Sequence, residues 1–160
     1  MFSLNLFVPN CVLAMEFYKN VFGAVAIHSS FNAPTGFKSA QFKIGDANFA
    51  MADENADLGS KSPITLGAVS MCIQIDVEDV IEWNTVDKGF SPKIANGVLK
   101  IVEKALKLDS YLIAPSTEDK PLCCTKDGVQ FCNLKDPFGF IWSLCRTTIS
   151  SKSQTEQSTT

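Results

Sequence analysis

The alternation of hydrophobic and polar residues predicts short strands and two helices. Residues 2–9 alternate at first between polar and apolar, as a half-buried strand does. Between Cys11 and Phe22 many of the apolar residues recur every three or four positions, which is typical of an amphipathic helix. Asn10 is suited to cap the start of this helix, and Gly23 is suited to end it in a left-handed conformation.

Three antiparallel strands are predicted to follow, over residues 24–31, 37–44 and 47–52, because turn sequences separate three runs of strand-like composition. The segment 55–67 contains acids, Gly, Ser and Pro and is interpreted as a linker.

The second half of the chain repeats the same order. A strand over 68–77 is followed by an amphipathic helix over 92–108, and strands are predicted over 110–114, 128–134 and 140–146. The chain therefore reads as an α+β domain over residues 1–147, with a βαβββ module over 2–54 and a second module over 68–147. The Ser/Thr-rich tail, 148–160, is predicted to be disordered.

The second module is longer than the first, mainly because of an extra stretch at 81–93 between its first strand and its helix. Trp83 and Phe90 within this stretch indicate that it packs on the body of the protein or on a partner.

Several motifs occur in an order that resembles one known family. They are Ala14 to Gly23 around Phe17-Tyr18, Ile44-Gly45-Asp46, Met51 to Glu54, Ser62-Pro63, Val77 to Val80, and Asp136-Pro137-Phe138-Gly139 with Trp142-Ser143-Leu144. Together they resemble the vicinal-oxygen-chelate superfamily of glyoxalases, bleomycin-resistance proteins and extradiol dioxygenases, and in particular its PhnB-like branch. The resemblance implies two βαβββ modules whose sheets form a curved mixed sheet around a cleft, in a homodimer.

The closing motif, Asp136 to Gly139, has a clear structural interpretation. Pro fixes one backbone angle, Gly permits a positive φ, and the Asp side chain can cap the turn. We therefore expect it to serve the fold rather than the chemistry.

The resemblance also implies four metal-ligand positions, on the first and fourth strands of each module. Motif spacing places them at Ser3, near Ala50, near Cys72 and at Ser143. Neutral hydroxyls, an alanine and a thiol are poor ligands for hard divalent metals. Asp53 and Glu54 could contribute only after a register shift. A site without metal or other cofactor is therefore favoured over a divalent-metal site.

Small or polar residues and aromatic residues near these positions are candidates for lining a cleft. The candidates are Ser3, Asn5, Met51, Cys72, Gln74, Trp142 and Ser143.

Composition, charge and the lengths of apolar runs bear on the possible partners and location of the protein. The 160 residues are 46% hydrophobic and carry a net charge of −3, which argues against a nucleic-acid partner. No apolar run is long enough to cross a membrane, and no signal-peptide pattern is present, so a cytoplasmic location with six reduced cysteines is expected. His28 is the single histidine, which excludes a metal site built on several histidines of one chain; we expect it to be packed or on the surface.

The leading hypothesis is a metal-free homodimer that binds a small molecule. The alternatives are a metal-dependent lyase, thiol transferase or dioxygenase of the same superfamily, or a protein that sequesters a drug. The sequence names no catalytic residue and does not decide whether the protein is an enzyme.

Overall fold

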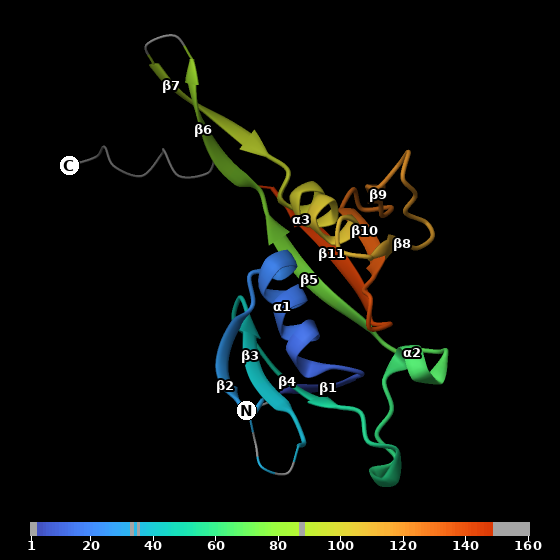
Figure 1. Cartoon of the computed structure of the whole chain (residues 1–160). Coiled ribbons are helices and arrows are strands. Elements are labelled where there is room, and N and C mark those ends of the chain that lie inside the picture. Colours follow the sequence, from blue (N-terminus) through green and yellow to red (C-terminus); the bar gives the residue numbers. More distant parts are fainter. Residues whose placement is uncertain (1–2, 33, 35, 87–88, 149–160) are drawn as a thin grey trace, which may run out of the picture.

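The structure is a computed structural model that describes residues 3–32, 34, 36–86 and 89–148, with the backbone alone over 82–86 and 89–93. The predicted disorder of the tail falls almost wholly outside the described residues. The first five elements form module one, a four-stranded sheet in the order β1-β4-β3-β2 with β1 parallel to β4 (Figure 1). They are β1 (Leu4–Val8), α1 (Cys11–Phe22), β2 (Val25–Ser29), β3 (Ser39–Ile44) and β4 (Ala47–Asp53).

Module two repeats this arrangement. Its main sheet has the order β5-β11-β10-β8, with β5 parallel to β11, and a short strand β9 pairs with β10. The βαβββ order therefore occurs twice, as predicted, in a mixed α+β fold. The elements are β5 (Cys72–Glu78), α3 (Gly97–Leu106), β8 (Tyr111–Leu112), β9 (Cys123–Cys124), β10 (Gln130–Lys135) and β11 (Ile141–Thr147).

The residues predicted to cap and to end the first helix do so in α1. The Asn10 side chain accepts hydrogen bonds from the backbone N–H groups of Val12 and Leu13, and Gly23 ends the helix with a φ of 68°. No helix in the described part of the chain is long and apolar enough to cross a membrane.

The structure differs from the sequence predictions in three places. Residues 81–93 lie in an antiparallel hairpin of β6 (Val80–Val86) and β7 (Gly89–Ala95), so the second helix starts at Gly97 rather than at residue 92. The segment 55–67, interpreted as a linker, holds two short helices that had not been predicted, η1 (Ala56–Leu58) and α2 (Pro63–Leu66). The strand β9 had not been predicted.

One hydrophobic core joins the two modules. Helix α1 covers the module-one sheet and also reaches the closing turn and β11 of module two. The Phe22 and Trp142 rings are 4.5 Å apart between centroids, and Tyr18 packs edge-on against Trp142 at 5.6 Å. Both Tyr18 and Trp142 are fully buried. The contact between modules is therefore aromatic and made by side chains far apart in sequence.

Candidate functional site

Each sheet has one face covered by its helix and one face turned away from it, which we call the open face. In module one, Leu6, Phe42 and Met51 are buried on the helix-covered face. Because successive strand residues point to opposite faces, the residues between them belong to the open face.

A row of side chains crosses the open face of module one. Strand pairing aligns Asn5 with Ala50, Ala50 with Gln41, and Gln41 with His28. Neighbours in such a row are about 5 Å apart, so four strands contribute to one track roughly 15 Å long. Asn5, Gln41 and His28 are all exposed. We call this set row one.

A shorter row crosses the open face of module two. Gln74 on β5 pairs with Ser143 on β11, and Ser143 pairs with Asn133 on β10. Gln74 is exposed, whereas Ser143 and Asn133 are partly buried. The Oδ1 atom of Asn133 is buried and has no hydrogen-bond partner among the described residues. We call this set row two, and this free acceptor is its most unusual feature, because a buried polar atom normally finds a partner.

Five of the predicted site residues lie on the open faces. Asn5 belongs to row one, with the exposed Ser3 two residues before it, and Gln74 and Ser143 belong to row two. Cys72 pairs with Ile141, two pairs along from row two and therefore on the same face.

The other two candidates for lining a cleft, Met51 and Trp142, do not lie on the open faces. Both are almost fully buried on the helix-covered faces. The indole N–H of Trp142 donates to the buried carboxylate of Asp136, at 2.8 Å. Alternation along the strand accounts for this difference from the other candidates, since each is next in sequence to an open-face residue, Ala50 or Ser143.

The four positions at which the resemblance implies metal ligands do not suit a divalent metal. Ser143 and Ala50 supply no anionic atom, and Cys72 offers a thiol, which favours softer metals; partial burial also raises the pKa of this thiol, which disfavours the thiolate that a metal would bind. The structure pairs Ser143 with Gln74, whose side chain is a neutral amide. Within the described part of the chain, no three His, Cys, Asp or Glu side chains come together as a metal site.

The two acids that could have replaced these ligands have other partners. Oδ1 of Asp53 accepts a 2.7 Å hydrogen bond from the backbone N–H of Cys11, the first residue of α1. Glu54 accepts from the Ser62 backbone N–H at 2.8 Å and from the Thr65 hydroxyl at 2.9 Å, and these bonds lower its pKa. Both carboxylates therefore stabilise helix starts.

The closing turn has the structural role expected of it. Oδ1 of Asp136 accepts from the backbone N–H groups of Phe138 and Phe140, each at 2.9 Å. Oδ2 accepts from the Tyr18 hydroxyl and from the Trp142 indole. Burial raises the pKa of the Asp136 carboxyl, and these four hydrogen bonds act in the opposite direction. The motif joins the modules and lies away from the open faces.

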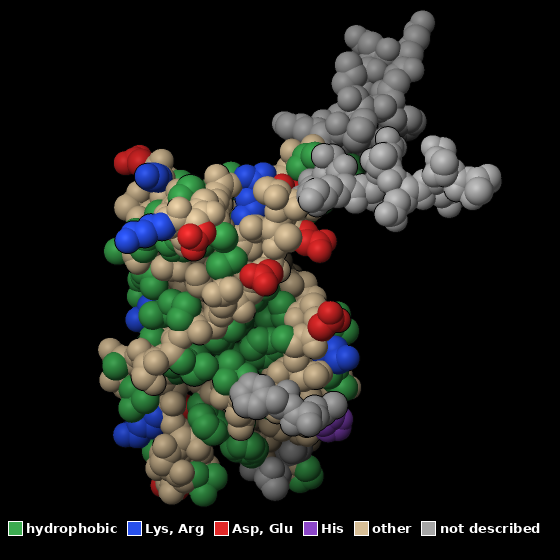
Figure 2. Space-filling model, turned by 180° about the vertical axis from the view of Figure 1, so that it is seen from behind, with side chains coloured by type: hydrophobic (Ala, Val, Ile, Leu, Met, Phe, Trp, Pro, Cys, Tyr) green, Lys and Arg blue, Asp and Glu red, His purple; other side chains and the backbone are tan. Residues whose placement is uncertain are grey.

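The surface opposite α1 has a mixed character. Seen from behind, hydrophobic side chains gather across the middle of the molecule, and most charged side chains lie at its margins (Figure 2). A separate shallow pocket of about 270 Å³ lies on the outer side of α1. It is lined by Val12, Met15, Glu16, Lys19, Asn20 and Phe31, none of which was a predicted site residue.

Comparison with solved structures identifies the fold as that of the glyoxalase/bleomycin-resistance/dioxygenase superfamily. FosX of Listeria monocytogenes, a fosfomycin resistance protein solved with Mn(II) and sulfate, is 14% identical with a TM-score of 0.61, over 93% of this chain and 90% of that one. A superfamily enzyme of Burkholderia phytofirmans PsJN is 18% identical with a TM-score of 0.59, over 90% and 95%. A glyoxalase-related enzyme of Fulvimarina pelagi is 14% identical with a TM-score of 0.58, over 92% and 87%.

No protein-family model matches the sequence, and no curated protein matches it. At these identities the similarity establishes the fold and leaves the chemistry to the residues of this chain.

The sequence analysis missed His28, Gln41 and Asn133 as members of the two rows. Period-two alternation in residues 37–44 and 128–134 could have placed Gln41 and Asn133 on one face of their strands. Which residue each one meets on the next strand depends on register. The irregular pairing between Ala26 and His28 makes the register of β2 particularly hard to read from sequence.

Proposed function

We propose that this protein is a metal-free homodimer that binds an uncharged small molecule on the open faces, within the PhnB-like branch of the superfamily and in the cytoplasm. The observation that carries the proposal is the buried, unpaired Oδ1 of Asn133 beside Ser143 and Gln74. Leaving such an acceptor unsatisfied costs roughly 1–3 kcal/mol, which a ligand carrying a hydrogen-bond donor would recover.

The chemistry of the rows supports an uncharged ligand. Asn5, Gln41, Gln74 and Asn133 are amides, and Ser143 is a hydroxyl, so each can both donate and accept hydrogen bonds. The poor fit of the family-type ligand positions to a divalent metal supports binding without a metal.

Two observations support a dimer. The strands β1 and β5 are edge strands of their sheets, and such edges are open to pairing with another chain. The hydrophobic middle of the surface in Figure 2 is the kind of patch that marks an interaction site.

Metal analysis of the purified protein is the first test. After extensive dialysis we expect far less than one equivalent of Mn, Fe, Ni or Zn per chain. Near-stoichiometric metal that resists dialysis would overturn the metal-free proposal. Activity assays with methylglyoxal and glutathione, fosfomycin and thiols, and catechols, each with added divalent metals, test the enzyme alternative directly.

A thermal-shift panel of polyols, amides and other uncharged small molecules is the second test. A compound that binds the native state raises the melting temperature by mass action. We expect the shift to be largely lost in Asn133→Ala and retained in Asn20→Ala, an exposed asparagine on α1 far from the rows. An unchanged shift in Asn133→Ala would contradict the proposed site.

One observation favours a second candidate, the sequestering of a cationic drug. Asp76 and Glu78 are exposed and follow Gln74 at alternate positions of β5, so they share its face. Cationic antibiotics in the same panel test this candidate. A shift seen only with cations and removed by Asp76→Asn would favour it over an uncharged ligand.

A further inference from the structure

The shallow pocket on the outer side of α1 is formed by one face of that helix and by Phe31, which comes from the segment after β2. The helix residues of the lining lie at positions i, i+3, i+4, i+7 and i+8, a spacing that brings side chains onto one side of a helix. These residues are Val12, Met15, Glu16, Lys19 and Asn20. One continuous strip of helix surface therefore makes most of the pocket.

The pocket is separate from rows one and two. Helix α1 lies across one face of the module-one sheet (Figure 1), and row one crosses the other face. Met15 is only 2% exposed and belongs to the same buried core as Phe42 of β3. The sheet and part of the core therefore lie between the pocket and row one, and a ligand in the pocket does not touch the residues of that row.

Apolar side chains supply one half of the lining. Val12 is 39% exposed, and Phe31 is partly buried. Met15 contributes to the lining although it is almost fully buried. A methionine and an aromatic ring both make favourable contacts with a further aromatic ring. This half of the pocket is therefore suited to a flat aromatic group.

The other half carries two charges of opposite sign that have no partner. Glu16 and Lys19 are exposed and lie one turn apart on α1. In the part of the chain that the structure describes, neither side chain forms an ion pair or a hydrogen bond. The acid and lysine of α3 behave differently, since Nζ of Lys107 lies 2.7 Å from Oε1 of Glu103. The pocket therefore presents a free carboxylate and a free ammonium group.

We propose that this pocket binds a free α-amino acid with an aromatic side chain. Its ammonium group faces Glu16, its carboxylate faces Lys19, and its ring lies on the apolar half. Residues three apart on a helix have Cβ atoms about 5–6 Å apart, which matches two charged groups attached to one carbon atom. The amide of Asn20 can donate to the carboxylate or accept from the ammonium group.

The size of the pocket and the balance of its charges support this class of ligand. Its volume of about 270 Å³ is just below the roughly 300 Å³ at which pockets for drug-sized ligands begin, so the ligand is small. A zwitterion meets both charges, whereas a simple cation or anion leaves one of them unmatched. The proposal goes beyond the proposed function and does not depend on it.

Weak binding is expected. Both charged side chains are exposed, and exposed ion pairs contribute little. We therefore expect a dissociation constant on the order of 1 mM for L-phenylalanine, as is usual for a small ligand in a shallow site.

An NMR titration of the isotope-labelled full chain with L-phenylalanine is the test. We expect saturable shifts of the backbone amide signals of residues 12–20 and of Phe31, and no shift at Gln74, Asn133 or Ser143. Phenethylamine lacks the carboxylate and 3-phenylpropanoate lacks the ammonium group. Each is expected to bind at least about threefold more weakly than phenylalanine, because one exposed ion pair is lost.

Two variants assign the charges. Glu16→Gln should weaken phenylalanine binding at least about threefold and leave the binding of 3-phenylpropanoate unchanged, because that ligand has no ammonium group. Lys19→Gln should weaken phenylalanine binding in the same way and leave phenethylamine unaffected. Glu103→Gln on α3 is the matched control and should change none of these affinities. A variant that merely disturbed α1 would weaken all three ligands alike.

The outcomes decide for or against the pocket. Saturable shifts at α1, with the stated dependence on ligand charge and on Glu16 and Lys19, support the proposal. The absence of saturable shifts at α1 overturns it, and so does equal binding of the three ligands to the unchanged chain. Glu16→Gln should leave the thermal shifts assigned to Asn133 intact, so failure of this pocket and failure of the proposed function are distinguishable.

Discussion

Tyr18 on α1 donates a 2.9 Å hydrogen bond from its hydroxyl to Oδ2 of Asp136, a residue 118 positions further along the chain. Both side chains are almost fully buried. This bond links the first helix of module one to the closing turn of module two. It joins two of the motifs on which the resemblance rests, Ala14 to Gly23 and Asp136 to Gly139.

Tyr18→Phe tests this link. The substitution keeps the aromatic packing and removes one of the two donors to Oδ2, so we expect a loss of about 1.5–3 kcal/mol in the free energy of unfolding, as for a hydrogen bond to a charged group. Urea denaturation measures the loss. Tyr111→Phe, at an exposed tyrosine, is the control and should change stability by less than about 0.5 kcal/mol. Equal stability of the two variants would show that the buried bond contributes nothing.

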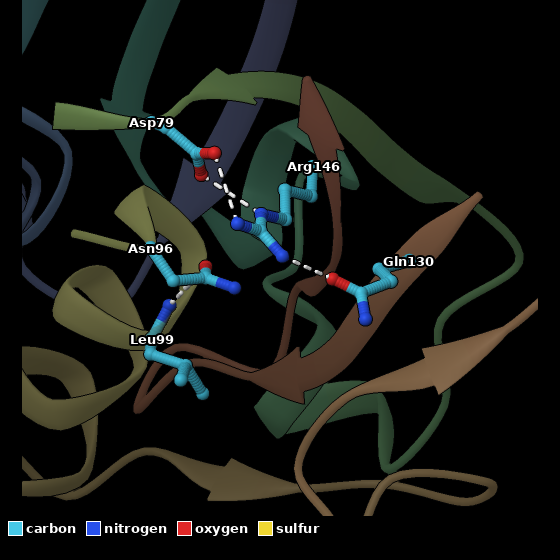
Figure 3. A network of polar contacts seen from close by, with 5 residues as sticks. All are labelled: Asp79, Asn96, Leu99, Gln130 and Arg146. Atoms are coloured by element: carbon cyan, nitrogen blue, oxygen red, sulfur yellow. Dashed lines mark hydrogen bonds and ion pairs between the residues drawn. The ribbon is translucent and has the colours of Figure 1, made fainter. Parts of the chain in front are cut away.

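The partly buried ion pair between Asp79, which precedes β6, and Arg146 on β11 predicts a pH dependence of stability (Figure 3). The hydrogen bonds from Arg146 lower the pKa of Asp79 in the folded state. A lowered pKa means that the unfolded chain binds more protons in acid, so the contribution of Asp79 is present above its ordinary pKa and is lost as pH falls through the lowered one.

Asp79→Asn should therefore be less stable than the wild type at pH 7, and the difference should shrink as the pH falls toward 3. Denaturation curves at several pH values measure this difference. Glu103→Gln is the matched control, because the Glu103–Lys107 pair is exposed and contributes little. A difference for Asp79→Asn that is constant with pH would contradict the ion pair as its source.

The cysteines are expected to differ widely in reactivity. All six are free thiols. Burial and the neighbouring Asp53 raise the pKa of Cys11 to about 12. With iodoacetamide at neutral pH, Cys124 should be alkylated first because it is exposed, and Cys72 more slowly because its pKa is raised. Cys11 should react only on unfolding. Peptide mass spectrometry over time reads out each site, and early labelling of Cys11 would show that α1 does not cover it as described.

Gly97→Ala tests the close approach of α3 to β5. A methyl group there would collide with the Glu78 carbonyl oxygen and press on the Val77 side chain. Because the collision involves backbone, the helix must shift, and we expect a loss of about 1–3 kcal/mol in stability. Lys104→Ala, on the exposed side of the same helix, should have little effect. A fully stable Gly97→Ala protein would mean that the helix can move away from β5 without cost.

Local patterns predicted much of the fold but not all of it. The helix α1 was predicted with its ends because Asn10 and Gly23 act through their nearest neighbours. The start of α3 was placed five residues too early, because Pro92 and Ile94 suit a helix as well as a strand in sequence. Pairing of residues 89–95 with β6 decided between the two.

The candidate site, like the fold, could be predicted from the sequence only in part. Ser143 and Gln74 were recognised separately from motifs and alternation, whereas their direct pairing and the free Oδ1 of Asn133 appear only once β5, β11 and β10 are in register. The sequence did not separate Met51 and Trp142 from the open-face candidates, because a shift of one position along a strand exchanges the core for the surface.

The sequence by itself determined the duplicated βαβββ order, the caps of α1 and the role of Asp136 as a turn former, since each depends on contacts a few residues apart. Only the tertiary structure decided that Asp136 also accepts hydrogen bonds from Tyr18 and Trp142, and that Asp53 and Glu54 accept hydrogen bonds at helix starts. It also decided that β6 and β7 form a hairpin separate from the two main sheets. Those features depend on strand register and on packing between distant segments. These features are stabilised by contacts with residues that are far away in the sequence.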